Sequence, residues 1–159
     1  MTEFTLALAL VDFIPVVAFG IAIILLAGVF NSPLFLIGAV ASLLAGVFKV
    51  LWKLILGTSG KDIKWLNRSF LPLQAGGWLV MLLAVILNIR RISFPAVLSA
   101  VSGLPQLIFF ILWLVLMGTM VWYKKNRFDK YDAKTNWVAE IVNSLGQCCF
   151  LAAMLFAVG

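Results

Sequence analysis

The residues whose chemistry suits solute binding are two carboxylates, two lysines and three amides that interrupt otherwise apolar segments. They are Asp12, Lys49, Lys53, Gln74, Glu140, Asn143 and Gln147. Carboxylates bind cationic groups, lysines bind anionic groups, and amides supply both a donor and an acceptor. Charged groups inside a membrane are energetically unfavourable unless they are paired or hydrated, and they often mark a functional site. We therefore predict that this set forms a ligand-binding site.

The last apolar segment, at 137–158, carries a polar stripe. Asn136, Glu140, Asn143 and Gln147 are separated by four, three and four residues, so they fall on one face of a helix. A polar face on a membrane-spanning helix must be turned toward something other than lipid. This spacing indicates that the helix forms one wall of a polar chamber.

A second stripe lies on the segment at 34–56. Gly38, Ser42, Ala45, Lys49 and Lys53 follow at steps of four, three, four and four. Small residues on one face let a neighbouring helix approach closely. The two lysines are therefore predicted to lie on a packing face rather than toward lipid.

The estimated depth of these residues in the membrane places them at one level. At about 1.5 Å of rise per residue, the polar positions on four helices lie roughly 5–15 Å inside the same boundary. Their charges cancel, and the simplest pairing joins Asp12 to Lys49 and Glu140 to Lys53. The amides would then complete the hydrogen bonds. Trp78 and Trp113 lie nearer the middle of their segments, where they either pack or form the wall of a ligand site.

A purely structural explanation is also open. The lysines can extend to the headgroups, Glu140 can stabilise the N-terminus of its helix, and Asp12 lies shallower if the first helix starts later. The alternatives are then a structural ion-pair cluster and a hydrated chamber open to the cytoplasm. We favour the chamber, because one stabilising ion pair would not require three amides.

The composition defines the class of molecule. Of 159 residues, 64% are hydrophobic and 11% are charged, whereas soluble domains are about half apolar and about a quarter charged. The net charge of +6 suits anionic lipid headgroups, and no nucleic-acid partner is expected. Histidine is absent, and no P-loop, nucleophile elbow or dinucleotide fingerprint occurs. We predict no catalytic residue, metal or cofactor.

The pattern of apolar segments predicts an all-α bundle of five transmembrane helices in a single domain. The expected spans are 5–30, 34–56, 71–88, 96–123 and 137–158. We expect Pro15 to loosen the first helix and Pro105 to kink or restart the fourth. Residues 57–69 form a predicted amphipathic segment in the headgroup region. The basic loops place the N-terminus in the cytoplasm and the C-terminus outside, in a bacterial plasma membrane.

The resulting functional hypothesis is binding or transport of a small polar or zwitterionic solute, or of an ion, through this chamber. The odd number of spans favours a homo-oligomer or a complex with a membrane partner subunit. The first alternative is a non-catalytic membrane subunit or scaffold whose polar cluster is structural or docks a partner. The second is a lipid-handling enzyme that uses the amphipathic segment.

Overall fold

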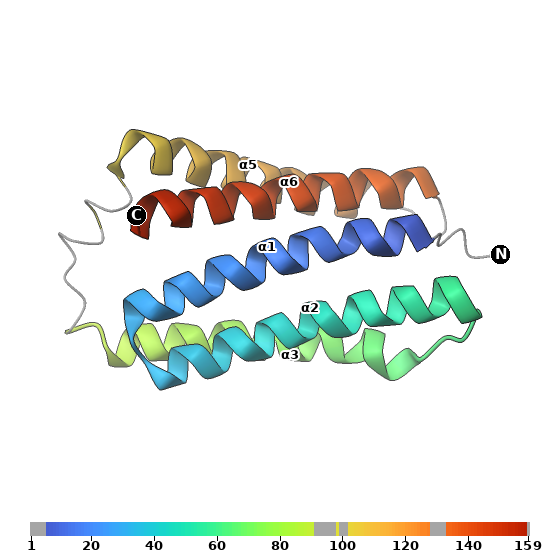
Figure 1. The fold of residues 1–159 in the computed structure, drawn as a ribbon, viewed down its shortest axis with the longest axis horizontal. Coiled ribbons are helices and arrows are strands. Elements are labelled where there is room, and N and C mark those ends of the chain that lie inside the picture. The colour runs from blue at the N-terminus through green and yellow to red at the C-terminus, as the bar shows by residue number, and fades with distance from the viewer. Residues whose placement is uncertain (1–5, 91–97, 99–101, 128–132, 159) are drawn as a thin grey trace.

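Five long helices account for most of the chain. The computed structural model describes residues 6–90, 98, 102–127 and 133–158, and within these residues it contains no strand. The helices, shown in Figure 1, are α1 (Leu6–Phe30), α2 (Pro33–Ser59), α3 (Lys64–Leu87), α5 (Leu104–Asn126) and α6 (Ala133–Val158).

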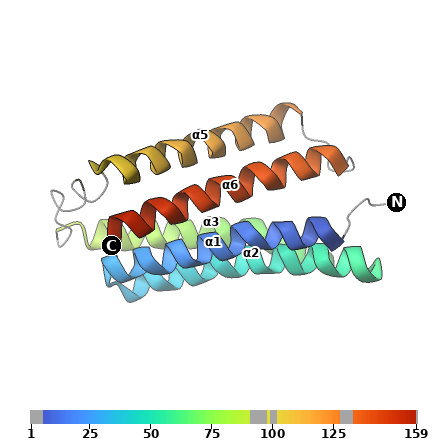
Figure 2. The same ribbon diagram turned by 45° about the horizontal axis from the view of Figure 1, so that its top comes forward.

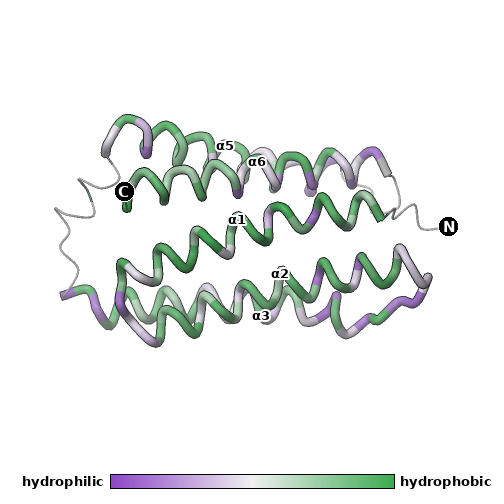
Figure 3. Tube along the Cα trace, viewed as in Figure 1, coloured by the Kyte–Doolittle hydropathy of each residue, from purple (hydrophilic) through white to green (hydrophobic). Residues whose placement is uncertain are grey.

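Each of the five helices is long and apolar enough to cross a membrane. The shortest has 23 residues, which is about 35 Å of helix against a hydrocarbon core of about 30 Å. Hydrophobic residues run along the middle of the helices, and hydrophilic residues collect chiefly at one end (Figure 3). The predictions of an all-helical protein and of five candidate membrane spans are confirmed.

We call that end of the bundle the basic end. It is where α1, α3 and α6 begin and where α2 and α5 finish (Figure 1). The basic residues of the described loops and helix ends there are Lys61, Lys64, Arg68, Lys124, Lys125, Arg127 and Lys134. At the opposite end the described part of the chain contributes only Arg90.

The connection between α2 and α3 differs from the predicted interfacial segment at 57–69. α2 continues to Ser59 and ends at Gly60, whose φ of 68° closes the helix in the left-handed conformation. α3 already begins at Lys64. Most of the expected segment therefore belongs to α2 and α3, and the described residues form no separate helix between them. The indole of Trp52 donates a 2.8 Å hydrogen bond to Asp62 and fastens the short loop to α2.

Turn chemistry accounts for the other described helix boundaries. Asn31, at φ 42°, reverses the chain after α1. Ser32 then caps α2 by accepting a hydrogen bond from the Phe35 amide. α5 starts directly after Gly103 with Pro105 in its first turn, as expected for a restarted helix. The beginning of the predicted fourth span, at 96, lies outside the described residues. α1 is continuous through Pro15, so the expected loosening does not interrupt the helix.

The helices pack in a series rather than in a closed ring. The extensive contacts join α3 to α2, α2 to α1, α1 to α6, and α6 to α5. Figure 1 shows α1 between the α2–α3 pair and the α5–α6 pair, and Figure 2 shows α6 between α5 and the other three helices. α3 and α5 are therefore the two ends of the series, and α1 joins its two halves.

The α2–α3 pair has the closest packing. A Cβ built on Gly38 would meet the Gly77 carbonyl oxygen at 2.6 Å, and one built on Gly77 would meet the Gly38 carbonyl oxygen at 2.7 Å. The missing side chains let the two backbones come together, as the small-residue stripe on α2 predicts. An apolar cluster continues this contact away from the basic end. It comprises Ile23, Ala27, Phe35, Ala39, Met81 and Ala84.

This contact predicts different effects for two adjacent glycines. Gly77→Ala should lower the free energy of unfolding by about 1–3 kcal/mol, because its methyl group collides with backbone atoms of α2. Gly76→Ala is the matched control, since a Cβ there meets nothing within 4 Å. Thermal unfolding in detergent, followed by circular dichroism, measures both. Equal stability of the two variants would contradict the close α2–α3 contact.

Candidate functional site

A buried charge triad joins three helices near the basic end. The Lys53 ammonium on α2 lies 2.8 Å from Asp12 Oδ2 on α1 and donates a 2.5 Å hydrogen bond to Glu140 Oε1 on α6. Each of the three residues is at most 6% exposed. The triad therefore brings together Asp12, Lys53 and Glu140, three of the predicted site residues.

The triad lies at one level of the bundle. Each member is about 9–10 Å along its helix from the basic end. Glu140 is two turns inside α6, beyond the first turn where a helix dipole favours an acid. Lys53 is 4% exposed and paired, so it does not extend to the headgroups. These positions exclude two of the structural explanations, namely that Lys53 extends to the headgroups and that Glu140 stabilises the N-terminus of its helix.

The pairing of the ions differs in part from the prediction. Glu140 pairs with Lys53 as expected, but Asp12 also pairs with Lys53 and not with Lys49. The Lys49 ammonium instead lies 4.4 Å from the centre of the Phe70 ring. Side chains one turn apart on α2 thus have different partners, because the rotation of α1 about its axis directs Asp12 toward Lys53.

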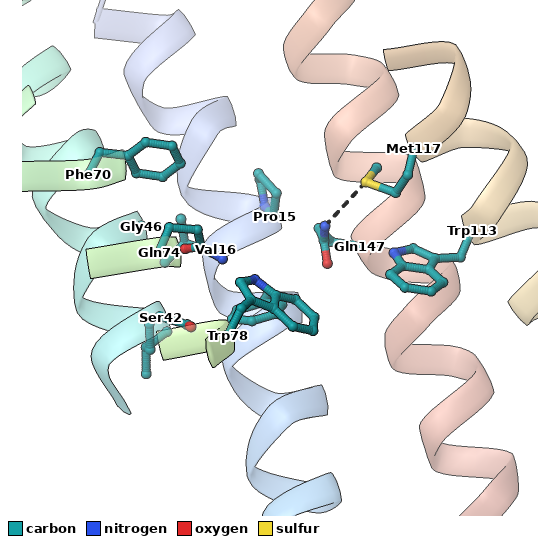
Figure 4. Close-up of a pocket in the computed structure, with 12 residues that line it drawn as sticks. Pro15, Val16, Ser42, Gly46, Phe70, Gln74, Trp78, Trp113, Met117 and Gln147 are labelled. Atoms are coloured by element: carbon teal, nitrogen blue, oxygen red, sulfur yellow. Dashed lines mark hydrogen bonds between the residues drawn. The ribbon is translucent and has the colours of Figure 1, made fainter. Parts of the chain in front are cut away.

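A cavity of about 300 Å³ lies deeper in the bundle than the triad. Its nearest lining residues on α1, α2 and α6 are one to two turns, about 5–10 Å, from the triad members and Lys49. Residues of all five helices line it (Figure 4). They are Pro15, Val16, Phe19, Ser42, Leu43, Gly46, Phe70, Gln74, Trp78, Trp113, Met117 and Gln147.

Three buried polar atoms of this lining have no hydrogen-bond partner in the described part of the chain. They are Ser42 Oγ, Trp113 Nε1 and Gln147 Oε1. The nitrogen of Gln147 is satisfied more weakly, by a 3.6 Å contact with the Met117 sulfur across the α5–α6 interface (Figure 4). The cavity therefore offers one fixed donor, one fixed acceptor and one hydroxyl that can act as either.

Gln74 has a supporting position in the same wall. Its amide nitrogen donates to the Ser42 carbonyl oxygen at 3.1 Å, and its oxygen accepts from the Trp78 indole at 2.8 Å. Both polar atoms of Gln74 are thus used within the protein. The consequence is that Gln74 orients Trp78, while the hydroxyl of Ser42 remains available.

The predicted set separates into two groups. Gln74 and Gln147 line the cavity, whereas the charged members other than Lys49 form the triad. Asn143 is half-buried on α6, and it belongs neither to the triad nor to the lining. Trp78 and Trp113, for which packing and a ligand wall were both open, line the cavity. Ser42 was placed on a packing face only, and its position on the same stripe of α2 as Lys49 and Lys53 was the signal for it.

Comparison of the chain with protein-family models, with curated proteins and with solved structures finds no match. Within the described residues, no three His, Cys, Asp or Glu side chains gather as metal ligands. The triad and the cavity are therefore the features that bear on function.

The triad predicts that loss of its cation is more harmful than loss of all its charges. Lys53→Met leaves two buried carboxylates unpaired and should lower the free energy of unfolding by about 3–5 kcal/mol. Adding Asp12→Asn and Glu140→Gln should restore most of that stability. Denaturation of the purified protein in mixed micelles measures each variant.

Lys61→Met, at an exposed loop position, is the control and should leave stability unchanged. A triple variant less stable than Lys53→Met would contradict a triad in which Lys53 neutralises the two carboxylates.

Proposed function

We propose that the protein binds or transports a small polar solute, including zwitterions, at this intramembrane cavity. The observation that carries the proposal is the set of three buried, unpartnered polar atoms around one cavity, contributed by α2, α5 and α6. A buried polar atom without a hydrogen bond destabilises a protein by about 1–3 kcal/mol. A bound solute offers compensating hydrogen bonds.

The size and lining of the cavity support a small solute. A volume of about 300 Å³ is at the lower limit for ligand sites, which combine apolar walls with a few placed polar groups. Here the walls are aromatic, and the donor of Trp113 and the acceptor of Gln147 orient the ligand. The triad supports the site from outside, because its charges are already paired with one another.

The proposed orientation places the basic end of the bundle in the cytoplasm. The basic end carries nearly all described basic residues of the loops and helix ends, and the positive-inside rule places such an end in the cytoplasm. The N-terminus would be cytoplasmic and the C-terminus external. The triad and the cavity would then lie in the cytoplasmic half of a bacterial plasma membrane, in a homo-oligomer or beside a partner subunit.

One observation favours the alternative of a non-catalytic subunit. The Lys53 ammonium pairs with both carboxylates, as in a purely structural cluster, although Glu140 Oε2 has no hydrogen-bond partner among the described residues. Under this alternative the cavity has no specific occupant. For the lipid-handling enzyme, the residues of the amphipathic segment are present as the end of α2, the short loop and the start of α3.

A variant that fills the cavity distinguishes solute binding from the alternative of a non-catalytic subunit. Gly46 lines the cavity, and its nearest non-local neighbour is a Val16 methyl group at 3.1 Å. Gly46→Leu should displace Val16, which also lines the cavity, and reduce binding at least tenfold. The measurement is equilibrium binding of a panel of radiolabelled amino acids, amines, amides and short carboxylates to the purified protein.

The matched control is Gly28→Leu on α1, where a Cβ meets nothing within 4 Å. This variant should bind as the wild type does. Unchanged binding by Gly46→Leu would place the site elsewhere, and a wild-type protein that binds no member of the panel would favour the subunit.

A further inference from the structure

Lys49 is a cation with unused binding capacity. Neither of the two ion pairs formed by the described residues involves it, and its ammonium lies over the Phe70 ring. A cation–π contact stabilises a cation by less than its transfer from water into the membrane interior destabilises it. The contact with Phe70 therefore leaves the Lys49 charge only partly compensated.

Lys49 is not among the described lining residues, but two of its neighbours are. Phe70, beneath its ammonium, forms part of the cavity wall, and so does Gly46, about one turn away on α2. Helical side chains lean toward the N-terminus of their helix. On α2 that direction leads from Lys49 toward Gly46 and Ser42. The ammonium is thus at the end of the cavity nearer the triad.

The charges around Lys49 favour an anion. Lys53 already holds both nearby carboxylates, Asp12 and Glu140. Lys124 on α5 is close enough to add a third positive charge, so three cations face two carboxylates. Among the described residues, the cavity lining itself contains no acidic residue. One negative charge delivered by a ligand would balance the region.

The rest of the cavity suits an aromatic or apolar body. Phe19 and Trp78 contribute neighbouring rings, with centroids 6.4 Å apart, and Trp113 adds a third ring from α5. Gln147 Oε1 lies in the same wall as an acceptor without a partner. A flat ring that carries one N–H or O–H group matches these features.

We infer that the ligand is a small aromatic carboxylate whose anionic group pairs with Lys49 and whose ring lies between the aromatic walls. This inference rests on the proposed function and names the class of its solute. The carboxylate forms a charge-assisted hydrogen bond with the lysine. A donor on the ring reaches Gln147.

Three related probes test the inference on the wild-type protein. Indole-3-propionate has the carboxylate, its primary amide has the same shape without charge, and tryptamine has a cation instead. Isothermal titration calorimetry in detergent should show the carboxylate binding at least tenfold more tightly than either analogue. The indole N–H gives each probe the donor for Gln147.

Variants of Lys49 then locate the anion site. Lys49→Gln should remove the preference for the carboxylate over the amide, and Lys49→Arg should retain most of it. Lys64→Gln, an exposed lysine at the start of α3, is the control and should keep the full preference. The comparison of the three probes needs only the wild-type protein, so it remains decisive if Lys49→Gln is poorly folded.

Equal affinity for the carboxylate and the amide would overturn the inference, as would a preference for tryptamine. Retention of the preference in Lys49→Gln would overturn the assignment to Lys49. If none of the three probes binds but another solute of the panel does, the class of ligand is wrong and the proposed function stands. If the wild-type protein binds no solute at all, the proposed function fails as well.

Discussion

The structure depends on one buried ammonium group held by two carboxylates. Lys53 on α2 contacts Asp12 on α1 and Glu140 on α6, yet α2 and α6 have no extensive packing contact of their own. The ion pairs therefore link the two halves of the helix series, which otherwise meet through α1. A buried ion pair adds little net stability, but breaking it leaves an uncompensated charge. This penalty opposes sliding or rotation of α1 between its neighbours.

The ion pairs of Lys53 also keep the two carboxylates of the triad away from the cavity. Because Lys53 pairs with both carboxylates, a ligand in the cavity would meet uncharged polar groups and aromatic rings, and Lys49 would be the charged group nearest to it. Lys49 is one turn further along α2 and lacks a carboxylate partner among the described residues. With low-dielectric walls around it, its attraction for an anion is stronger than it would be in water. One turn of helix thus distinguishes a lysine that holds the bundle together from one that is available to a ligand.

Sequence reasoning predicted the five helices more readily than the contacts of single side chains. The apolar segments and the small-residue stripe of α2 follow from local pattern, and so does the common depth of the polar residues. The partner of Asp12 does not, because it depends on how far α1 is rotated relative to α2. The segment at 57–69 has an amphipathic pattern, but the left-handed conformation of Gly60 ends α2 late and leaves room for only a short loop.

The cavity was harder to anticipate, because it arises from packing between helices distant in sequence. Gly46 leaves space beside α1, and Trp113 and Met117 approach from α5, although α5 packs extensively only on α6. Trp78 comes from the other end of the series, on α3. A ligand between these walls would contact both halves of the bundle at a level where α1 alone connects them. Because such a ligand binds only the assembled bundle, its binding free energy would add to the stability of that arrangement. The triad and an occupied cavity would then hold the two halves together at successive levels of the membrane.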